Sequence, residues 1–158
     1  MISVLFVCLG NICRSPMAEA VFRHDVIKAG LENKIHIDSA GTGDWHIGEP
    51  PHQGTILKLK EYGISSQGIY ARQVKKDDFD QFQWIIGMDT SNVENLHKIA
   101  QTTHSHVYPF IQFIPSTPYE GVPDPWYTGN FQETYDLVQQ GCKKLLDEIV
   151  SKHGLSKK

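Results

Sequence analysis

The segment 8–15, Cys-Leu-Gly-Asn-Ile-Cys-Arg-Ser, places a thiol and a guanidinium group a few residues apart. Successive backbone N–H groups in a tight loop can converge on one anion, and an arginine can bind two phosphate oxygens at once. Gly10 and Asn11 are residue types that tolerate the left-handed backbone that a closed loop requires. Cationic surroundings favour a thiolate, the nucleophile that phosphoryl transfer through a covalent intermediate needs. The segment predicts a phosphate-binding loop with Cys8 as the attacking group.

The sequence on either side predicts a strand before this loop and a helix after it. Residues 2–7 form an apolar run rich in β-branched residues, which is typical of a strand buried on both faces. Ser15 and Pro16 are suited to the N-cap and the first helical position, and Gly30 is placed to end the helix. The N-terminus of that helix would add unpaired N–H groups and a positive dipole end to the loop.

Two other interpretations of these residues are disfavoured. A buried structural Cys8 and an unrelated Arg14 could produce the same short pattern, but the strand, the Gly-Asn pair and the helix together favour phosphate binding. A zinc site is disfavoured because four residues separate Cys8 from Cys13, which suits no common ligand spacing. We expect no metal and no cofactor.

The rest of the chain predicts one α/β domain over residues 1–158. Strands alternate with helices, which indicates a doubly wound domain with a central four-stranded parallel sheet flanked by helices. Ligands in such sheets bind beyond the carboxyl ends of the strands, where the loop after strand 1 lies. The further strands are expected at 35–38, 84–88 and 106–113, and the further helices at 55–62, after Asp89, and over 131–149.

A second group of candidates lies in two loops rich in glycine and proline. Asp124 stands between two prolines, beside Trp126 and Tyr127, in surroundings that favour a protonated carboxyl. It is a candidate general acid, although a simple proline turn would give the same spacing. Trp45 in the other loop, with Trp126 or Tyr127, could form the walls of a cleft for a phosphorylated phenol.

Composition excludes several classes of function. The net charge of −3 gives no footprint for nucleic acid, and no stretch approaches the ~20 apolar residues of a membrane span. Three cysteines are too few for a disulfide scaffold, which indicates a reducing, cytoplasmic location. Cys142 lies on the apolar stripe of the last helix and is expected to be an inert core thiol.

The segment Val7–Glu19 resembles the signature of the low-molecular-weight protein-tyrosine phosphatases. The resemblance extends over 38–42, Asp44-Trp45, Met88-Asp89 and 122–127, and so covers nearly the whole chain. It implies hydrolysis of phosphotyrosine in tyrosine-phosphorylated proteins by a monomer or weak dimer. Phosphate or another oxyanion would occupy the loop.

The resemblance also implies a role for each candidate residue. Cys8 would be the nucleophile, Arg14 would bind phosphate, and Ser15 would help to make the thiolate a good leaving group. Asn11 and Ser39 would hold the loop in shape through hydrogen bonds. The acid would be Asp124, the rings of Trp45, Trp126 and Tyr127 would line the substrate cleft, and Leu9, Gly10, Ile12 and Cys13 would complete the loop. Cys13 would form a reversible disulfide with an oxidised Cys8.

Three alternatives differ in the residues that they require. An arsenate reductase would need two further cysteines for its electron relay, and only Cys142 remains. A phosphoarginine phosphatase of the same fold would carry threonine where this chain has Ile12. A non-enzymatic phosphate-binding module would have no need of both Cys8 and Asp124. One departure from the family is Tyr62, which stands where animal members have a histidine that supports the loop.

Overall fold

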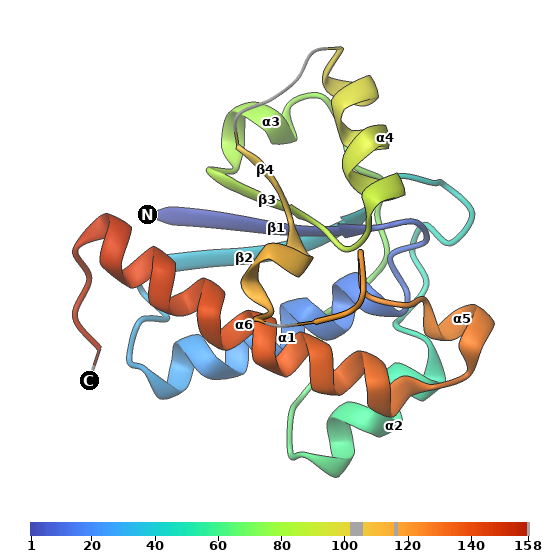
Figure 1. Cartoon of the computed structure of the whole chain (residues 1–158), viewed down its shortest axis with the longest axis horizontal. Helices are drawn as coiled ribbons and strands as arrows, with labels where there is room; N and C mark the ends of the chain where they lie inside the picture. Colours follow the sequence, from blue (N-terminus) through green and yellow to red (C-terminus); the bar gives the residue numbers. More distant parts are fainter. Residues whose placement is uncertain (102–105, 116, 158) are drawn as a thin grey trace.

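The computed structural model describes residues 1–101, 106–115 and 117–157 and contains a four-stranded parallel sheet. The strands lie in the order β2-β1-β3-β4, and every neighbouring pair is parallel (Figure 1). Their bounds are Ile2–Cys8 for β1, Ile35–Gly41 for β2, Trp84–Gly87 for β3 and Val107–Pro109 for β4. The predicted fold class is confirmed.

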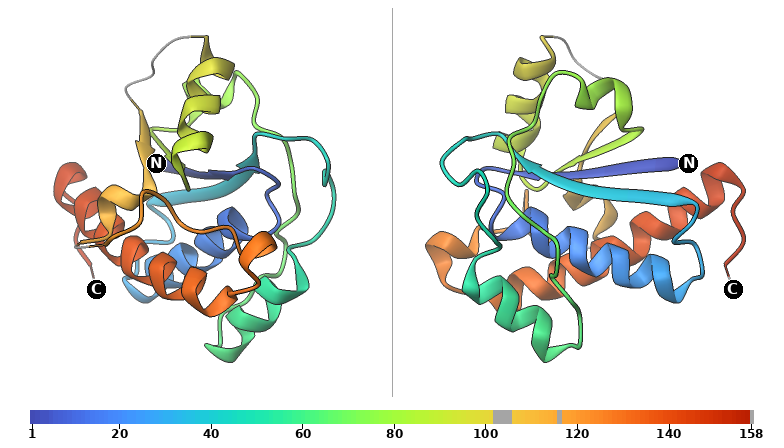
Figure 2. Two further views of the ribbon diagram at one scale, coloured as in Figure 1. Left: turned by 45° about the vertical axis from the view of Figure 1, so that its right-hand side comes forward. Right: turned by 180° about the vertical axis from the view of Figure 1, so that it is seen from behind.

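Helices cover both faces of the sheet (Figures 1 and 2). One face packs against α1 (Arg14–Lys28) and α6 (Phe131–His153), and the other carries α3 (Asp78–Gln81) and α4 (Thr90–Ala100). Two shorter elements, α2 (Gln53–Glu61) and α5 (Pro125–Thr128), lie on the same side as α1 and α6 (Figure 1).

The apolar run of β1 is continuous because both faces of this strand are buried. Val4 and Phe6 pack in the larger core beneath α1 and α6, whereas Leu5 and Val7 pack in the smaller core with α3 and α4. All four side chains are fully buried. Burial of each contributes about 1.5–3 kcal/mol to the stability of the fold. The strand β1 is therefore a firm base for the loop that follows Cys8.

The prediction of a strand over 106–113 is wrong beyond Pro109. The strand β4 ends at Pro109, and Phe110–Phe113 form a 3₁₀ helix, η1. Proline has no N–H to continue a ladder of hydrogen bonds. The 3₁₀ geometry brings residues three apart to the same side, and both Phe110 and Phe113 are thereby fully buried in the larger core.

Helix α1 begins earlier than predicted. Arg14 is its first residue and Cys13 holds the N-cap position without a capping side-chain hydrogen bond. Ser15 does not cap the helix, because its hydroxyl is engaged with Cys8 and Asn11 instead. The predicted apolar stripe of the last helix is found in α6, where Cys142 is fully buried.

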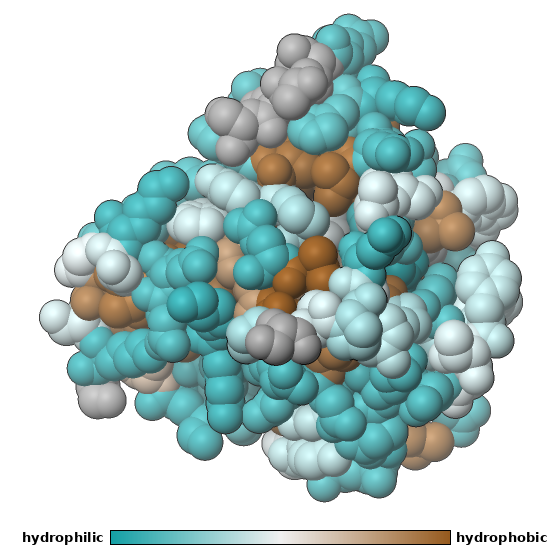
Figure 3. Space-filling model, in the orientation of Figure 1, coloured by the Kyte–Doolittle hydropathy of each residue, from teal (hydrophilic) through white to brown (hydrophobic). Residues whose placement is uncertain are grey.

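Hydrophilic residues cover most of the face seen in Figure 3, and hydrophobic residues appear between them in patches. Among the described residues, no helix is long and apolar enough to cross a membrane.

Candidate active site

The candidate site lies at the switch point of the sheet. The chain runs from β1 to β2 on one side and returns to β3 on the other side of β1. The connections after β1 and β3 therefore diverge at the carboxyl ends of adjacent strands, which is where such sheets bind ligands. Residues 9–13 follow β1, and Asp89 follows β3.

The loop after β1 is anchored through its carbonyl groups. The carbonyl of Leu9 accepts a hydrogen bond from the N–H of Gly43 (2.9 Å), and that of Ile12 accepts one from the N–H of His52 (2.7 Å). The carbonyl of Cys13 accepts from the Thr55 hydroxyl. Within the described parts of the chain, the N–H groups of residues 10–13 have no hydrogen-bond acceptor. A tight loop with unpaired N–H groups before a helix N-terminus is an anion-binding arrangement.

Asn11 connects the loop to its surroundings. Its φ of 56° lies in the left-handed region, as predicted for this position, whereas Gly10 does not adopt such a φ. Both hydrogens of the Asn11 amide are used, one on the Ser15 hydroxyl (2.8 Å) and one on the Ser39 hydroxyl (3.0 Å). Its Oδ1 accepts from the backbone N–H of Arg72 (3.0 Å). The side chain is 1% exposed, so these bonds are shielded from water.

The Ser39 hydroxyl leads to a buried carboxylate. It accepts from Asn11 and donates to Glu19 Oε1 on α1 (2.6 Å). The other oxygen of Glu19 accepts from Arg23 one helical turn further on. This pairing compensates for the burial of the Glu19 side chain, which is 7% exposed.

Cys8 ends β1 and is 2% exposed. Its Sγ lies 3.0 Å from the Ser15 hydroxyl oxygen. Because that oxygen already accepts from Asn11, the Ser15 hydrogen is free to be donated to sulfur. A hydroxyl donor stabilises the thiolate relative to the thiol.

Arg14 is held by two carboxylates at the start of α1. Its Nη1 donates to Asp89 Oδ2 (2.6 Å) and to the Val122 carbonyl (3.0 Å), and its Nη2 lies 3.4 Å from Asp124 Oδ2. Burial alone favours the neutral guanidinium, but the charges of Cys8, Asp89 and Asp124 outweigh it and raise the pKa of Arg14. Its buried Nε has no acceptor among the described residues.

For Asp89, the residues themselves predicted only that a helix would follow it. Asp89 caps α4, because Oδ1 accepts from the N–H of Asn92 (2.8 Å). Its second oxygen also binds Arg14. Sequence analysis missed this contact because the two residues lie 75 positions apart.

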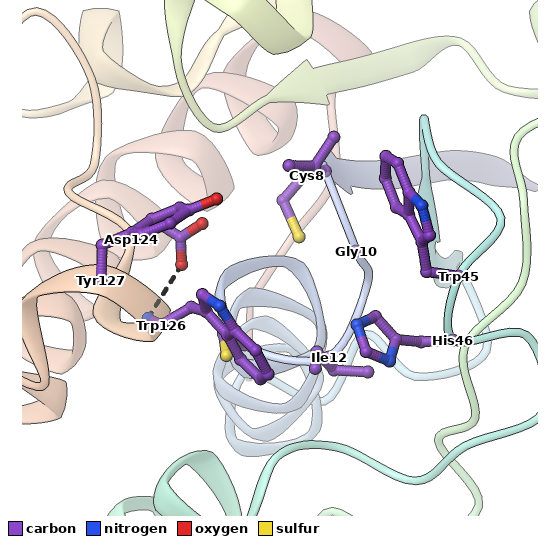
Figure 4. Close-up of a pocket in the computed structure, with 10 residues that line it drawn as sticks. Cys8, Gly10, Ile12, Trp45, His46, Asp124, Trp126 and Tyr127 are labelled. Carbon is purple, nitrogen blue, oxygen red and sulfur yellow. Dashed lines mark hydrogen bonds between the residues drawn. The ribbon is translucent and has the colours of Figure 1, made fainter.

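Asp124 lies beside Arg14 and begins a helix that was expected to be a loop. The side chain of Asp124 accepts from the N–H of Trp126 (3.0 Å) and caps α5, with Pro125 in the first helical position (Figure 4). The Asp-Pro pair is a helix-start signal that could have predicted α5. Capping leaves Oδ2 facing Arg14.

Cys8 and Asp124 line a cavity of about 220 Å³, whereas Arg14, Asn11 and Ser15 lie outside its lining. Figure 4 shows the Cys8 sulfur at its centre, with Asp124, Trp126 and Tyr127 on one side and Trp45 on the other. The three rings are exposed, with 67% of Trp45, 54% of Trp126 and 76% of Tyr127 accessible to solvent. The lining comprises Cys8, Leu9, Gly10, Ile12, Cys13, Trp45, His46, Asp124, Trp126 and Tyr127.

His46 is a lining residue that sequence analysis missed. Its ring lies near Trp126, with 5.9 Å between the ring centroids, and its Nδ1 lies 2.8 Å from Glu49 Oε2. A Cβ at Gly10 would lie 3.1 Å from the His46 ring, so the ring packs closely on the loop. Because His46 directly follows Trp45, the sequence could have indicated that it also lines the cavity.

The remaining cysteines are buried thiols. Burial raises the pKa of Cys13 to about 12, and the nearby charges of Cys8 and Asp124 add to the effect. Burial also raises the pKa of Cys142 well above its ordinary value. The Cys142 thiol contacts the Ala18 carbonyl of α1, at 3.7 Å, so it lies in the core.

Tyr62 is not part of the loop network. Its ring stacks on Tyr135 of α6, with 4.0 Å between centroids, and its hydroxyl accepts from Gln132. It therefore joins α2 to α6, and Arg72 supplies the backbone N–H that fixes Asn11.

A strand, an anion-binding loop and a helix at the switch point of a parallel sheet define the class of α/β phosphate-binding proteins. The chain belongs to the family of low molecular weight phosphotyrosine protein phosphatases, whose model matches residues 3–155. The low molecular weight protein-tyrosine-phosphatase YfkJ of Bacillus subtilis is 53% identical over 150 residues, which cover 94% of this chain and 96% of that protein. Its crystal structure superposes with a TM-score of 0.94, at 52% identity over 96% of each chain.

Two other relatives show the breadth of the similarity. The protein-tyrosine-phosphatase PtpA of Staphylococcus epidermidis strain RP62A is 42% identical over 158 residues and all of both chains. The crystal structure of a Drosophila arginine phosphatase has a TM-score of 0.84 and 31% identity, covering 92% of this chain and 96% of that one.

Proposed function

We propose that this chain hydrolyses phosphotyrosine in proteins through a phosphocysteine intermediate on Cys8. The observation that carries the proposal is the set of unpaired N–H groups in residues 10–13 beside the Cys8 sulfur. A phosphate in the loop would accept from those groups and from Arg14 Nε, the buried donor that has no acceptor among the described residues. Oxyanion and nucleophile would then be held by one rigid segment.

In the first step the Cys8 thiolate attacks phosphorus and the phenolic oxygen leaves. Three equatorial oxygens carry the charge of the transition state, and the loop N–H groups and Arg14 would stabilise it. Asp124, on the opposite side of the cavity from Trp45, would give a proton to the departing oxygen.

In the second step water attacks the phosphocysteine. Asp124, now a carboxylate, would take a proton from that water, and the sulfur would leave as a thiolate. The hydrogen bond from Ser15 (3.0 Å) would stabilise the leaving sulfur. Asn11 and Ser39 would keep Ser15 and the loop in position.

The shape of the cavity supports a phosphotyrosine substrate. Trp45 and Trp126 offer flat walls on either side of Cys8, and Ile12 adds an apolar side chain to the lining. Burial of a phenyl ring against them would contribute about 1.5–3 kcal/mol to the free energy of substrate binding. The shorter side chain of phosphoserine would not reach the loop past these rings.

Phosphoarginine is the second candidate substrate, because an arginine phosphatase has the same fold. Its guanidinium would lie beside the apolar Ile12 with its donors poorly satisfied. We therefore expect kcat/KM to be roughly ten- to a hundredfold higher for phosphotyrosine peptides than for phosphoarginine peptides. The Ile12→Thr substitution should reduce this difference. Wild-type hydrolysis of phosphoarginine as fast as phosphotyrosine would contradict the tyrosine assignment.

Arsenate reduction is less well supported. The third cysteine, Cys142, is fully buried on α6 against α1 and does not line the cavity. It is therefore poorly placed to carry electrons away from Cys8.

The test compares Cys8→Ser with Cys142→Ser, which makes the same atomic change in the core. A serine hydroxyl is not ionised at working pH, so Cys8→Ser should abolish hydrolysis while calorimetry still detects phosphate binding. The Cys142→Ser variant should retain activity. A Cys8→Ser turnover within tenfold of wild type would overturn the mechanism.

A further inference from the structure

A second crevice of about 270 Å³ lies on the other side of Trp45 from the candidate active site. Leu9 and Trp45 line both hollows, so the indole is the partition between them. The ring packs directly against Gly43, because a Cβ added to that glycine would lie only 1.9 Å from the ring. The remaining lining residues are Thr42 and Gly43 from the loop after β2 and Asn95, Lys98 and Ile99 from α4.

Three polar side chains of this crevice have no partners within the described parts of the chain. Lys98 forms no ion pair and the Asn95 amide no hydrogen bond there, and the buried Thr42 hydroxyl is likewise unpaired. Asn95 and Lys98 are three positions apart and share one face of α4. The ammonium of Lys98 and the amide of Asn95 are groups that donate hydrogen bonds to a carboxylate.

Among the described residues, the lining of the crevice carries a single charge, which is positive. Asp44 and Glu94 are the acidic residues adjacent in sequence to its lining, and both are exposed and outside the lining. Lys98 is thus the one charged side chain of the lining, in a chain with a net charge of −3.

We propose that this crevice is a specificity subsite that takes an acidic side chain next to the phosphotyrosine of a substrate protein. An extended peptide advances about 3.3–3.6 Å per residue. In the proposed binding mode, a residue one or two positions from a phosphotyrosine in the first cavity crosses the Trp45 partition and lies beside Lys98. The inference rests on the proposed function and adds to it the sequence context of the substrate.

The test is a set of phosphotyrosine peptides with alanine at every other position. Glutamate, its uncharged isostere glutamine, or lysine is placed singly at each of the two positions on either side of the phosphotyrosine. Wild type should prefer glutamate over glutamine by about twofold to fivefold in kcat/KM at one such position, the range expected of an exposed ion pair. The preference should shrink at high salt, because salt screens exposed charges.

Two variants assign the preference to Lys98. Lys98→Gln should abolish it and Lys98→Glu should reverse it in favour of lysine. Lys144→Gln on α6 is the matched control, since it removes the same charge from an exposed position away from the crevice, and it should leave the preference intact.

The failures of the two proposals can be distinguished. The subsite would be overturned if wild type showed no preference for glutamate beside the phosphotyrosine. It would also be overturned if wild type and both Lys98 variants showed the same preference. In either case the peptides would still be hydrolysed. An equal loss in Lys144→Gln would also overturn the subsite, because the effect would then come from net charge. Only a failure to hydrolyse any phosphotyrosine peptide would count against the proposed function itself.

Discussion

Replacement of Asn11 should reveal how much the shape of the phosphate-binding loop depends on one side chain. Asn11→Ala removes three buried hydrogen bonds, to Ser15, Ser39 and the N–H of Arg72. At about 0.5–1.5 kcal/mol each, their loss should lower the free energy of unfolding by about 2–4 kcal/mol. Alanine must also adopt the φ of 56°, which costs about 1 kcal/mol more.

Asn11→Gly is the matched variant, since it loses the same bonds but tolerates the left-handed backbone. Urea unfolding should show a large loss of stability in both variants. The free energy of unfolding should be about 1 kcal/mol lower for Asn11→Ala than for Asn11→Gly. Hydrolysis of an aryl phosphate should fall in both, because Ser15 loses the donor that orients its hydroxyl toward Cys8. An Asn11→Ala protein with a free energy of unfolding within about 0.5 kcal/mol of wild type would show that these hydrogen bonds do not hold the loop.

Three further predictions concern the acid and the thiols. Asp124→Ala should slow hydrolysis of aryl phosphates by ~10²–10⁴-fold, because the departing oxygen would lose its proton donor; turnover close to that of wild type would mean that another group supplies the proton. Iodoacetamide at pH 7, with mass spectrometry of peptides, should modify Cys8 and spare Cys13 and Cys142, because burial raises the pKa of both of the latter thiols; labelling of all three at similar rates would contradict this. After peroxide, dithiothreitol should restore the activity of wild type but not of Cys13→Ala, since Cys13 would capture the oxidised Cys8 sulfur as a disulfide. Disulfide formation should accelerate as pH rises, because attack requires the Cys13 thiolate and burial raises the pKa of that thiol. Recovery that is equal in both proteins would dispose of the idea.

Local patterns predicted the fold and the loop because each is encoded in neighbouring residues. The apolar run of β1 and the capping residue Asp89 of α4 depend on nearby sequence, and both elements are present. Pro109 limited the fourth strand for an equally local reason, which its missing N–H could have predicted. The short helix after Asp124 carried a local signal too.

Contacts between distant segments could not be predicted in the same way. The pairing of Arg14 with Asp89 exists because β1 and β3 are neighbours in the sheet, although the residues are 75 positions apart. The bond from Arg72 to Asn11 depends on a crossing of two loops, 61 positions apart. His46 reaches the cavity because its loop folds over Gly10, which no periodicity in the sequence indicates.

The most direct test of the central claim is to look for phosphate covalently bound to Cys8 during turnover. The enzyme would be mixed with a ³²P-labelled phosphotyrosine peptide, quenched within milliseconds and digested, and the labelled fragment would be identified by mass spectrometry. We expect label on Cys8 and none in Cys8→Ser. The labelled fraction should be larger in Asp124→Ala if this substitution slows the attack of water more than the attack of Cys8. Rapid turnover with no label on Cys8, or with label on another residue, would contradict it.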